Sequence, residues 1–221
     1  MWQLDGNVAR LVDEQCQAVL KLDEPFHGLS EWTVAGEQLA DNLLAIRSDA
    51  ETTPFDWPVV DAYVRGNDLA VSYGTTMSRP FSLQIYWSAL NLPPAVAAIE
   101  AVVSVQTELL QTHPGFALVS NLPTAASPRD FALADGAVLL HVGQSWSIAE
   151  LAPPTDFARG EAIENPAGGV TTRWRLEPEF LEKGVIRRVR VRTLVLPRSG
   201  DVKAAQQCYD QLCAERPPLT V

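Results

Sequence analysis

Residues 99–109, IEAVVSVQTEL, alternate apolar and polar side chains at nine of their eleven positions, with Val102 and Thr107 as the exceptions. Successive side chains of a β-strand point to opposite faces, so this alternation predicts a strand with one buried and one polar face. The apolar face holds Ile99, Ala101, Val103, Val105 and Leu109, and the polar face holds Glu100, Ser104, Gln106 and Glu108. The stretch therefore indicates a half-buried strand of a β-sheet protein.

The same two-residue period recurs on both sides of this stretch. Phe81, Leu83, Ile85 and Trp87 share one phase. Turn residues between such runs predict hairpins. One joins residues 59–65 to 69–73 through Gly66-Asn67-Asp68, and another joins residues 131–134 to 137–141 through Asp135-Gly136. Further strands are predicted at residues 8–12, 17–22, 32–34, 43–47, 116–120, 145–150, 171–176 and 185–196.

One helix is predicted near the end of the chain, at about residues 200–216. Its buried stripe is Val202, Ala205, Cys208, Tyr209, Leu212 and Cys213, with Ser199 as the cap and Pro217 as the stop. We therefore expect an all-β protein, an antiparallel β-sandwich with one C-terminal α-helix, in a single domain over residues 1–221. In outline, long alternating strands with one polar face resemble the sugar-epimerising, mutarotase-type supersandwich proteins.

Composition narrows the range of partners. The 221 residues carry a formal net charge of −10, which disfavours nucleic acids and anionic membranes as ligands. The first residues lack the basic and apolar regions of a secretory signal, so we expect a cytoplasmic protein. The three cysteines and three histidines have no metal-ligand spacing, and no nucleotide-binding or serine-nucleophile motif occurs. We therefore expect no metal and no cofactor.

Charge is concentrated in residues 171–197, TTRWRLEPEFLEKGVIRRVRVRTLVLP. From Arg173 to Arg198 there are eight basic residues and three glutamates. In the second run the valines share one phase, so Arg188, Arg190 and Arg192 point to the other side. If residues 171–176 pair with residues 185–195 across the intervening loop, Arg173 and Arg175 adjoin Arg190 and Arg188.

Neighbouring guanidinium groups in a sheet repel one another, so they need acidic partners or a bound anion. In one interpretation Glu177, Glu179, Glu182 or other carboxylates form an ion-pair lattice with them. In the other, the arginines belong to a non-enzymatic binding face for an anionic or carbohydrate small molecule, or for an acidic protein surface. The residues predicted for that face are Tyr63, Arg65, Gln84, Tyr86, Arg173, Arg175, Arg188 and Arg190.

The alternative function is a sugar isomerase, epimerase or lyase. His141 and Glu150 are its candidate acid–base pair, and that role requires the two side chains to lie within hydrogen-bond reach, directly or through one water. Whether the protein is an enzyme stays open at this stage. Among the tryptophans, Trp87, Trp146 and Trp174 lie in the apolar phases, whereas Trp57 and Trp2 are predicted to be free to meet a ligand.

Three segments resemble those of uncharacterised bacterial β-rich proteins. They are AYVRGNDL at residues 62–69, RPFSLQIYW at 79–87 and FLEKGVIRR at 180–188. The resemblance implies a β-rich fold and brings no catalytic residues with it.

Overall fold

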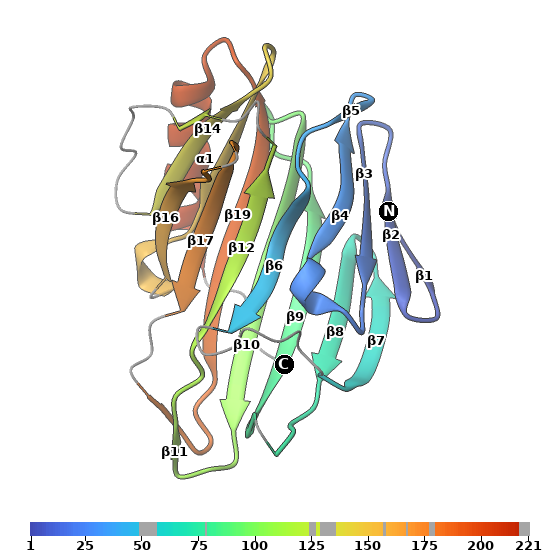
Figure 1. Cartoon of the computed structure of the whole chain (residues 1–221), viewed down its shortest axis with the longest axis vertical. Helices are drawn as coiled ribbons and strands as arrows, with labels where there is room; N and C mark the ends of the chain where they lie inside the picture. The colour runs from blue at the N-terminus through green and yellow to red at the C-terminus, as the bar shows by residue number, and fades with distance from the viewer. Residues whose placement is uncertain are drawn as a thin grey trace.

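The computed structural model describes residues 1–48, 57–77, 79–123, 127–128, 136–156, 158–166, 168–176 and 180–216. Two large antiparallel sheets pack face to face, and one α-helix lies behind the second sheet in the view of Figure 1. The antiparallel β-sandwich with a C-terminal helix, expected from the sequence, is confirmed.

The first sheet has nine strands, in the order β1-β2-β3-β4-β6-β12-β17-β16, with β5 paired to β4. The strands are β1 (Trp2–Asp5), β2 (Val8–Val12), β3 (Cys16–Lys21), β4 (Leu29–Val34), β5 (Glu37–Gln38), β6 (Asn42–Ser48), β12 (Phe116–Leu122), β16 (Ala158–Glu164) and β17 (Val170–Leu176). A 3-10 turn, η1 (Pro25–His27), precedes β4.

The second sheet has eight strands, in the order β13-β14-β15-β19-β10-β9-β8-β7. The strands are β7 (Val59–Arg65), β8 (Asp68–Tyr73), β9 (Phe81–Leu90), β10 (Ala97–Thr107), β13 (Ser127–Pro128), β14 (Ala137–Val142), β15 (Trp146–Leu151) and β19 (Arg187–Pro197). Two short strands, β11 (Gln111–Thr112) and β18 (Leu181–Glu182), form a separate pair, and a second 3-10 turn is η2 (Pro154–Asp156). The two large sheets meet at their edges, where β1 lies against β7 and β16 against β14.

The apolar phase of each strand faces the space between the sheets. Trp87 and Trp174, predicted to be core residues, are both buried there, together with the odd-numbered valines of β19. Gly160 of β16 lies opposite Trp174, and a Cβ at that position would come within 2.6 Å of the indole ring. Glycine is therefore required where the indole approaches the β16 backbone.

Two predicted features of individual strands need correction. Strand β10 is buried on both faces rather than half-buried, because it lies inside the eight-stranded sheet and its Glu100 is covered by an ion pair with Arg192. Leu109, expected in the core, lies beyond the end of β10 and is exposed. The hairpin through Gly66-Asn67 is confirmed, with Arg65 opposite Asp68, whereas residues 131–135 of the other predicted hairpin lie outside the described residues.

Helix α1 (Asp201–Ala214) packs on the outer face of the eight-stranded sheet. Ala204, Ala205, Cys208, Tyr209 and Leu212 contact an apolar area formed by β10, β14, β15 and β19. Cys208 is buried as predicted, but Cys213 is exposed because it lies one residue, and so about 100°, round the helix from Leu212. Gly200 is the N-cap instead of Ser199, and the described part of the chain contains no helix long and apolar enough to cross a bilayer.

A buried carboxyl group links the two sheets through the core. Glu150 of β15 is fully buried and accepts hydrogen bonds from Ser120 Oγ of β12, at 2.5 Å, and from Trp174 Nε1 of β17, at 2.7 Å. Ser120 Oγ also accepts a bond from the backbone N–H of Leu44, at 3.0 Å. Burial raises the pKa of Glu150, and the hydrogen bond from Ser120 opposes the rise. The hydroxyl groups of Thr172 and Thr193 also lower this pKa, although neither makes a hydrogen bond of ordinary geometry to a described residue.

We expect the substitution Glu150→Gln to change how stability depends on pH. A raised pKa in the folded state means that Glu150 stabilises the fold below its ordinary pKa of 4.5 and loses this contribution as the pH rises through the folded-state pKa. The amide mimics the protonated acid, so the unfolding free energy of the variant minus that of the wild type should increase with pH, by at most about 1.4 kcal/mol per pH unit.

Urea denaturation at several pH values between about 4 and 8 measures this difference. Glu161→Gln, at a half-exposed position on the outer face of β16, is the matched control for the same change of side chain outside the core. A pH-independent difference for Glu150→Gln would show that the buried carboxyl does not titrate as described.

Candidate functional site

Polar side chains cover the outer face of the eight-stranded sheet from β7 to β19. The register places Asp61, Ser72, Gln84, Ser104 and Arg188 in one row across the strands. Tyr63, Ala70, Tyr86, Val102 and Arg190 form the next row. We define the polar sheet face by its described polar residues Asp61, Tyr63, Arg65, Ser72, Gln84, Tyr86, Ser104 and Arg188.

Two tyrosines meet in the middle of the polar sheet face. Tyr63 and Tyr86 lie on strands separated by β8, and their hydroxyl oxygens are 3.5 Å apart. Ala70 of β8 lies between them in the register, and its small side chain leaves room for the two rings to approach. The hydrogen bond with Tyr63 and partial burial raise the pKa of Tyr86, while the positive charges of Arg188 and Arg65 lower it.

The two arginines of the face have no acidic partner among the residues described. Arg188 is half-buried, and its Nε donates a weak hydrogen bond, at 3.4 Å, to Ser104 Oγ. Burial lowers the pKa of Arg188, and the nearby charge of Arg190 lowers it further, against the attraction of Asp156. Arg65 is exposed near the end of β7 and makes no ion pair with a described residue. Both guanidinium groups can therefore receive an anion.

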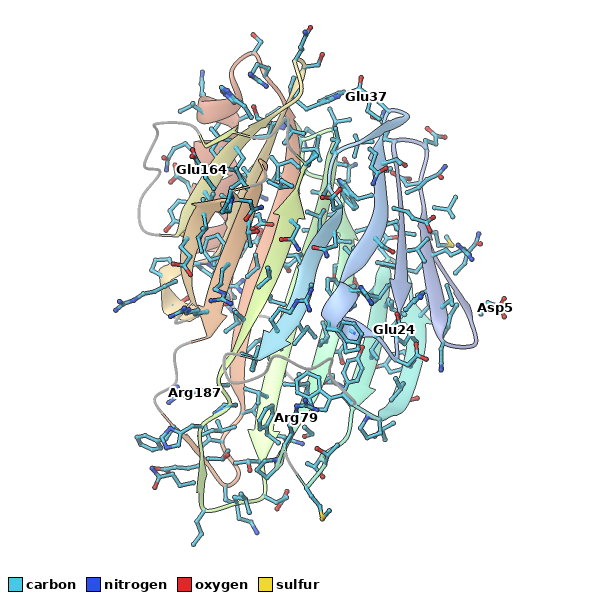
Figure 2. All side chains as sticks on the ribbon, in the orientation of Figure 1. Asp5, Glu24, Glu37, Arg79, Glu164 and Arg187 are labelled. Carbon is cyan, nitrogen blue, oxygen red and sulfur yellow. The ribbon has the colours of Figure 1, made fainter. Side chains whose placement is uncertain are left out.

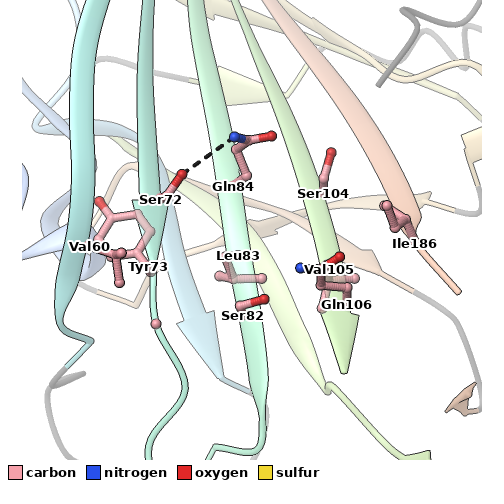
Figure 3. A pocket seen from close by; sticks show the side chains of 11 residues that line it. Val60, Ser72, Tyr73, Ser82, Leu83, Gln84, Ser104, Val105, Gln106 and Ile186 are labelled. Atoms are coloured by element: carbon pink, nitrogen blue, oxygen red, sulfur yellow. Dashed lines mark hydrogen bonds between the residues drawn. The ribbon is translucent and has the colours of Figure 1, made fainter. Parts of the chain in front are cut away.

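A hollow of about 360 Å³ lies beside these residues (Figure 3). Ser72, Ser82, Gln84, Ser104 and Gln106 provide its hydroxyl and amide groups, and the side-chain nitrogen of Gln84 lies 3.4 Å from Ser72 Oγ. Val60 of β7 and Ile186, just before β19, are exposed apolar side chains at its two ends. The hollow thus offers neutral hydrogen-bonding groups between two apolar side chains, with Arg188 next to Ser104.

The predicted pairing of the two arginine strands is wrong. Strand β17 pairs with β12 and β16 in the nine-stranded sheet, while β19 pairs with β10 and β15 in the other sheet. Arg173 and Arg175 therefore do not adjoin Arg190 and Arg188, and they lie outside the polar sheet face. The chain crosses from one sheet to the other between these strands instead of turning back as a hairpin.

Two of the β19 arginines are buried in ion pairs. Arg190 is 2% exposed, and Asp156 of η2 accepts bonds from its backbone N–H, at 2.9 Å, and from its Nε, at 3.0 Å. Arg192 is 3% exposed and binds Glu100 of β10, at 2.7 Å, and Glu215 at the end of α1, at 2.8 Å. The prediction that Arg190 is a ligand-binding residue is therefore corrected, because its charge already has a buried partner.

His141 and Glu150 do not form an acid–base pair. His141 lies opposite Ser147 in the hairpin of β14 and β15, with its Nε2 at 3.2 Å from the buried Asp201 of helix α1. Ser147 also donates a hydrogen bond to Asp201, at 2.6 Å. These contacts are on the outer face of the sheet, whereas Glu150 points into the core between the sheets. The two side chains therefore lie on opposite faces.

The tryptophans predicted to meet a ligand are core residues. Trp57 and Trp2 are 2% and 3% exposed. The ring of Trp57 packs against Tyr73 and Phe81, with centroid distances of 5.9 Å and 5.8 Å. Trp57 is not accessible although the sequence places it in a loop, because it lies two residues before β7 and its ring packs into the core.

Four polar residues of the hollow, Ser72, Ser82, Ser104 and Gln106, are not among the predicted ligand-binding residues. The alternation correctly predicts Ser104 and Gln106 on the polar side of their strand. No local sequence signal indicates that β9 and β10 are neighbours, and it is this pairing that brings their polar residues into one hollow. Ser72 and Ser82 gave no separate signal. Among the described residues, no group of three histidine, cysteine, aspartate or glutamate side chains could hold a metal ion.

No protein-family model matches the sequence, and no curated protein does. The fold is similar to solved structures. A mutant of the heparan sulfate lyase HepC from Pedobacter heparinus has a TM-score of 0.62 and 9% identity, covering 87% of this chain and 36% of that chain. A heparinase III gene product has a TM-score of 0.55 and 11% identity, covering 89% and 36%. A putative kojibiose phosphorylase from the human microbiome has a TM-score of 0.54 and 10% identity, covering 94% and 33%.

These similarities establish a shared β-sandwich fold. The chain spans about a third of the length of the solved chains that it matches. At this level of identity, the shared fold does not transfer the activity of those proteins.

The buried ion pair of Arg190 makes a separate prediction about stability. We expect Arg190→Ala to lower the unfolding free energy by about 3–5 kcal/mol, because it leaves the buried carboxylate of Asp156 without its partner. Arg188→Ala, two residues away on the same face, should change it by less than about 0.5 kcal/mol. Urea denaturation measures the unfolding free energy of each variant. Equal losses for Arg190→Ala and Arg188→Ala would contradict the view that Arg190 supports the fold and that Arg188 does not.

Proposed function

We propose that the protein binds a carbohydrate that carries an acidic group, on the polar sheet face. The observation that carries this proposal is the position of Arg188. Its guanidinium group is half-buried beside the hollow, with one weak hydrogen bond to Ser104 and no carboxylate partner among the described residues.

Arg188 suits a carboxylate or a sulfate as its ligand. The planar guanidinium group can donate two parallel hydrogen bonds to such an anion, and charge-assisted bonds of this kind are stronger than neutral ones. Arg188 is half-buried, which removes part of the water around its guanidinium group and lowers its pKa. A bound anion would therefore replace the hydrogen bonds to water that Arg188 loses through its partial burial.

The remaining groups of the face suit a sugar ring. Ser72, Gln84 and the Tyr63–Tyr86 pair supply hydroxyl and amide groups that can both donate and accept, as sugar hydroxyls require. Val60 and Ile186 can contact the apolar C–H surfaces of a ring. A row of such groups across five strands spans about 19 Å, since neighbouring strands lie about 4.8 Å apart. That length favours an oligosaccharide over a single sugar.

The fold supports the same ligand class. The structures reported above include proteins whose names refer to heparan sulfate and to kojibiose, and the first of these is an acidic polysaccharide. Binding is favoured over catalysis because the described lining of the hollow contains no histidine and no carboxylate, and Asp61, the carboxylate of the same row, lies at the opposite end of that row from Arg188. We therefore propose a binding role and no sugar-converting reaction.

We expect Arg188→Ala to weaken binding of acidic oligosaccharides by roughly 10- to 100-fold, the loss of one charge-assisted contact. The measurement is binding to an array of acidic oligosaccharides, each beside its carboxyl-reduced or desulfated counterpart. Gln84→Ala should weaken acidic and neutral members alike, because the amide contacts hydroxyl groups rather than the charge.

Arg10→Ala is the matched control. Arg10 is an exposed arginine on β2 in the other sheet, and its substitution should leave binding unchanged. The proposal is wrong if the wild-type protein binds no acidic oligosaccharide, or if Arg188→Ala retains full preference for the acidic members.

A further inference from the structure

A second group of arginines gathers on the outer face of the nine-stranded sheet. The register brings Arg159 of β16, Arg175 of β17, Ala117 of β12 and Arg47 of β6 into one row. Arg173 occupies the adjacent row, opposite Glu161. We call Arg47, Arg159, Arg173 and Arg175 the arginine patch.

Among the residues described, Arg47, Arg173 and Arg175 are only slightly neutralised, whereas Arg159 makes a contact of its own. Glu161 lies 3.9 Å from Arg175, and both side chains are about half exposed. Arg47 and Arg173 make no hydrogen bond or ion pair with a described residue. The Arg47 guanidinium instead lies 6.0 Å from the centroid of the Phe26 ring, and partial burial lowers its pKa.

The arrangement carries an electrostatic cost. Arg159 and Arg175 are directly opposite each other on neighbouring antiparallel strands, and like charges in such positions destabilise a sheet. The chain as a whole has a net charge of −10, and the acidic side chains Asp5, Glu24, Glu37 and Glu164 are spread around the outside of the molecule in Figure 2. Four arginines therefore share one face of a chain that is acidic overall.

We infer that the arginine patch is a second anion-binding site, and that it takes a single chain of a sulfated or carboxylated polysaccharide. The charge complementarity is direct, because guanidinium groups bind sulfate and carboxylate through paired hydrogen bonds. The row crosses four strands and is about 14 Å long, so a linear chain with repeated charges can meet several arginines at once.

A narrow chain fits this face better than a wide anionic surface. A membrane or a nucleic-acid duplex would bring many negative charges against the acidic remainder of the protein, which repels them. A single polysaccharide chain contacts the patch and avoids most of that repulsion. The patch and the polar sheet face lie on opposite outer faces of the sandwich, so this inference does not depend on the proposed function.

Fluorescently labelled heparin, a sulfated polysaccharide, tests the inference. We expect the double substitution Arg173→Ala with Arg175→Ala to weaken heparin binding at least 10-fold. We also expect the dependence of log affinity on log salt to become shallower, by about 0.7 per lost contact if heparin behaves as single-stranded nucleic acids do. Anisotropy titrations between about 50 and 200 mM salt measure both quantities.

Two controls separate this site from the polar sheet face and from loss of fold. Arg10→Ala should leave heparin affinity within about twofold of the wild type, and the double substitution should cause the same fold-loss of heparin affinity in an Arg188→Ala background as in the wild type. The urea midpoint of the double variant should be unchanged or higher, since Arg175→Ala removes the like-charge contact with Arg159. A lower midpoint together with weaker binding would attribute the loss to unfolding and would overturn the inference.

Two further results would also overturn it. One is heparin affinity in the double variant equal to that of the wild type. The other is stronger binding of the wild-type protein to phosphatidylserine vesicles or duplex DNA than to heparin at the same salt concentration, which would assign the patch to a different class of macromolecule.

Discussion

The phase of β19 is the constraint on which the outer face of the eight-stranded sheet depends. Its odd-numbered valines pack between the sheets, so Arg188, Arg190 and Arg192 must point outward. Two of these arginines, Arg190 and Arg192, form buried ion pairs with carboxylates from η2, β10 and the end of α1. The third has no such partner among the described residues. Buried ion pairs thus anchor the outer elements to the sheet at one end of β19 and leave a charge available at the other end.

Strand phase could be predicted from the sequence because it is a local property. The alternation in β9, β17 and β19 correctly assigned Trp87, Trp174 and the odd-numbered valines of β19 to the core, and the Gly66-Asn67 turn correctly indicated its hairpin. In β7 the predicted inward residue Val60 is exposed, because a bulge shifts the register between Val59 and Asp61. Strand pairing between distant segments has no such local signal. Arg173 and Arg188 were therefore assigned to one face, although β17 and β19 belong to different sheets.

The candidate site was predictable to the same extent. Tyr63, Arg65, Gln84, Tyr86 and Arg188 lie on one face because each has the outward phase of its own strand. The burial of Arg190 could not be foreseen, because its partner Asp156 comes from a 3-10 turn that carries no periodic pattern. The separation of His141 from Glu150 is predictable from the hairpin that pairs His141 with Ser147. In that hairpin the odd-numbered residues point to one face and the even-numbered residues to the other, so His141 and Glu150 point in opposite directions.

Ala70 affects the shape of the polar sheet face, although its side chain is small. It is a buried methyl group with no polar contact of its own, yet it occupies the place between the two phenol rings. A bulkier residue on β8 would hold the rings apart and divide the face into two smaller surfaces. If the polar sheet face binds a ligand as proposed, one side chain that need not touch the ligand therefore sets the shape of the surface that meets it.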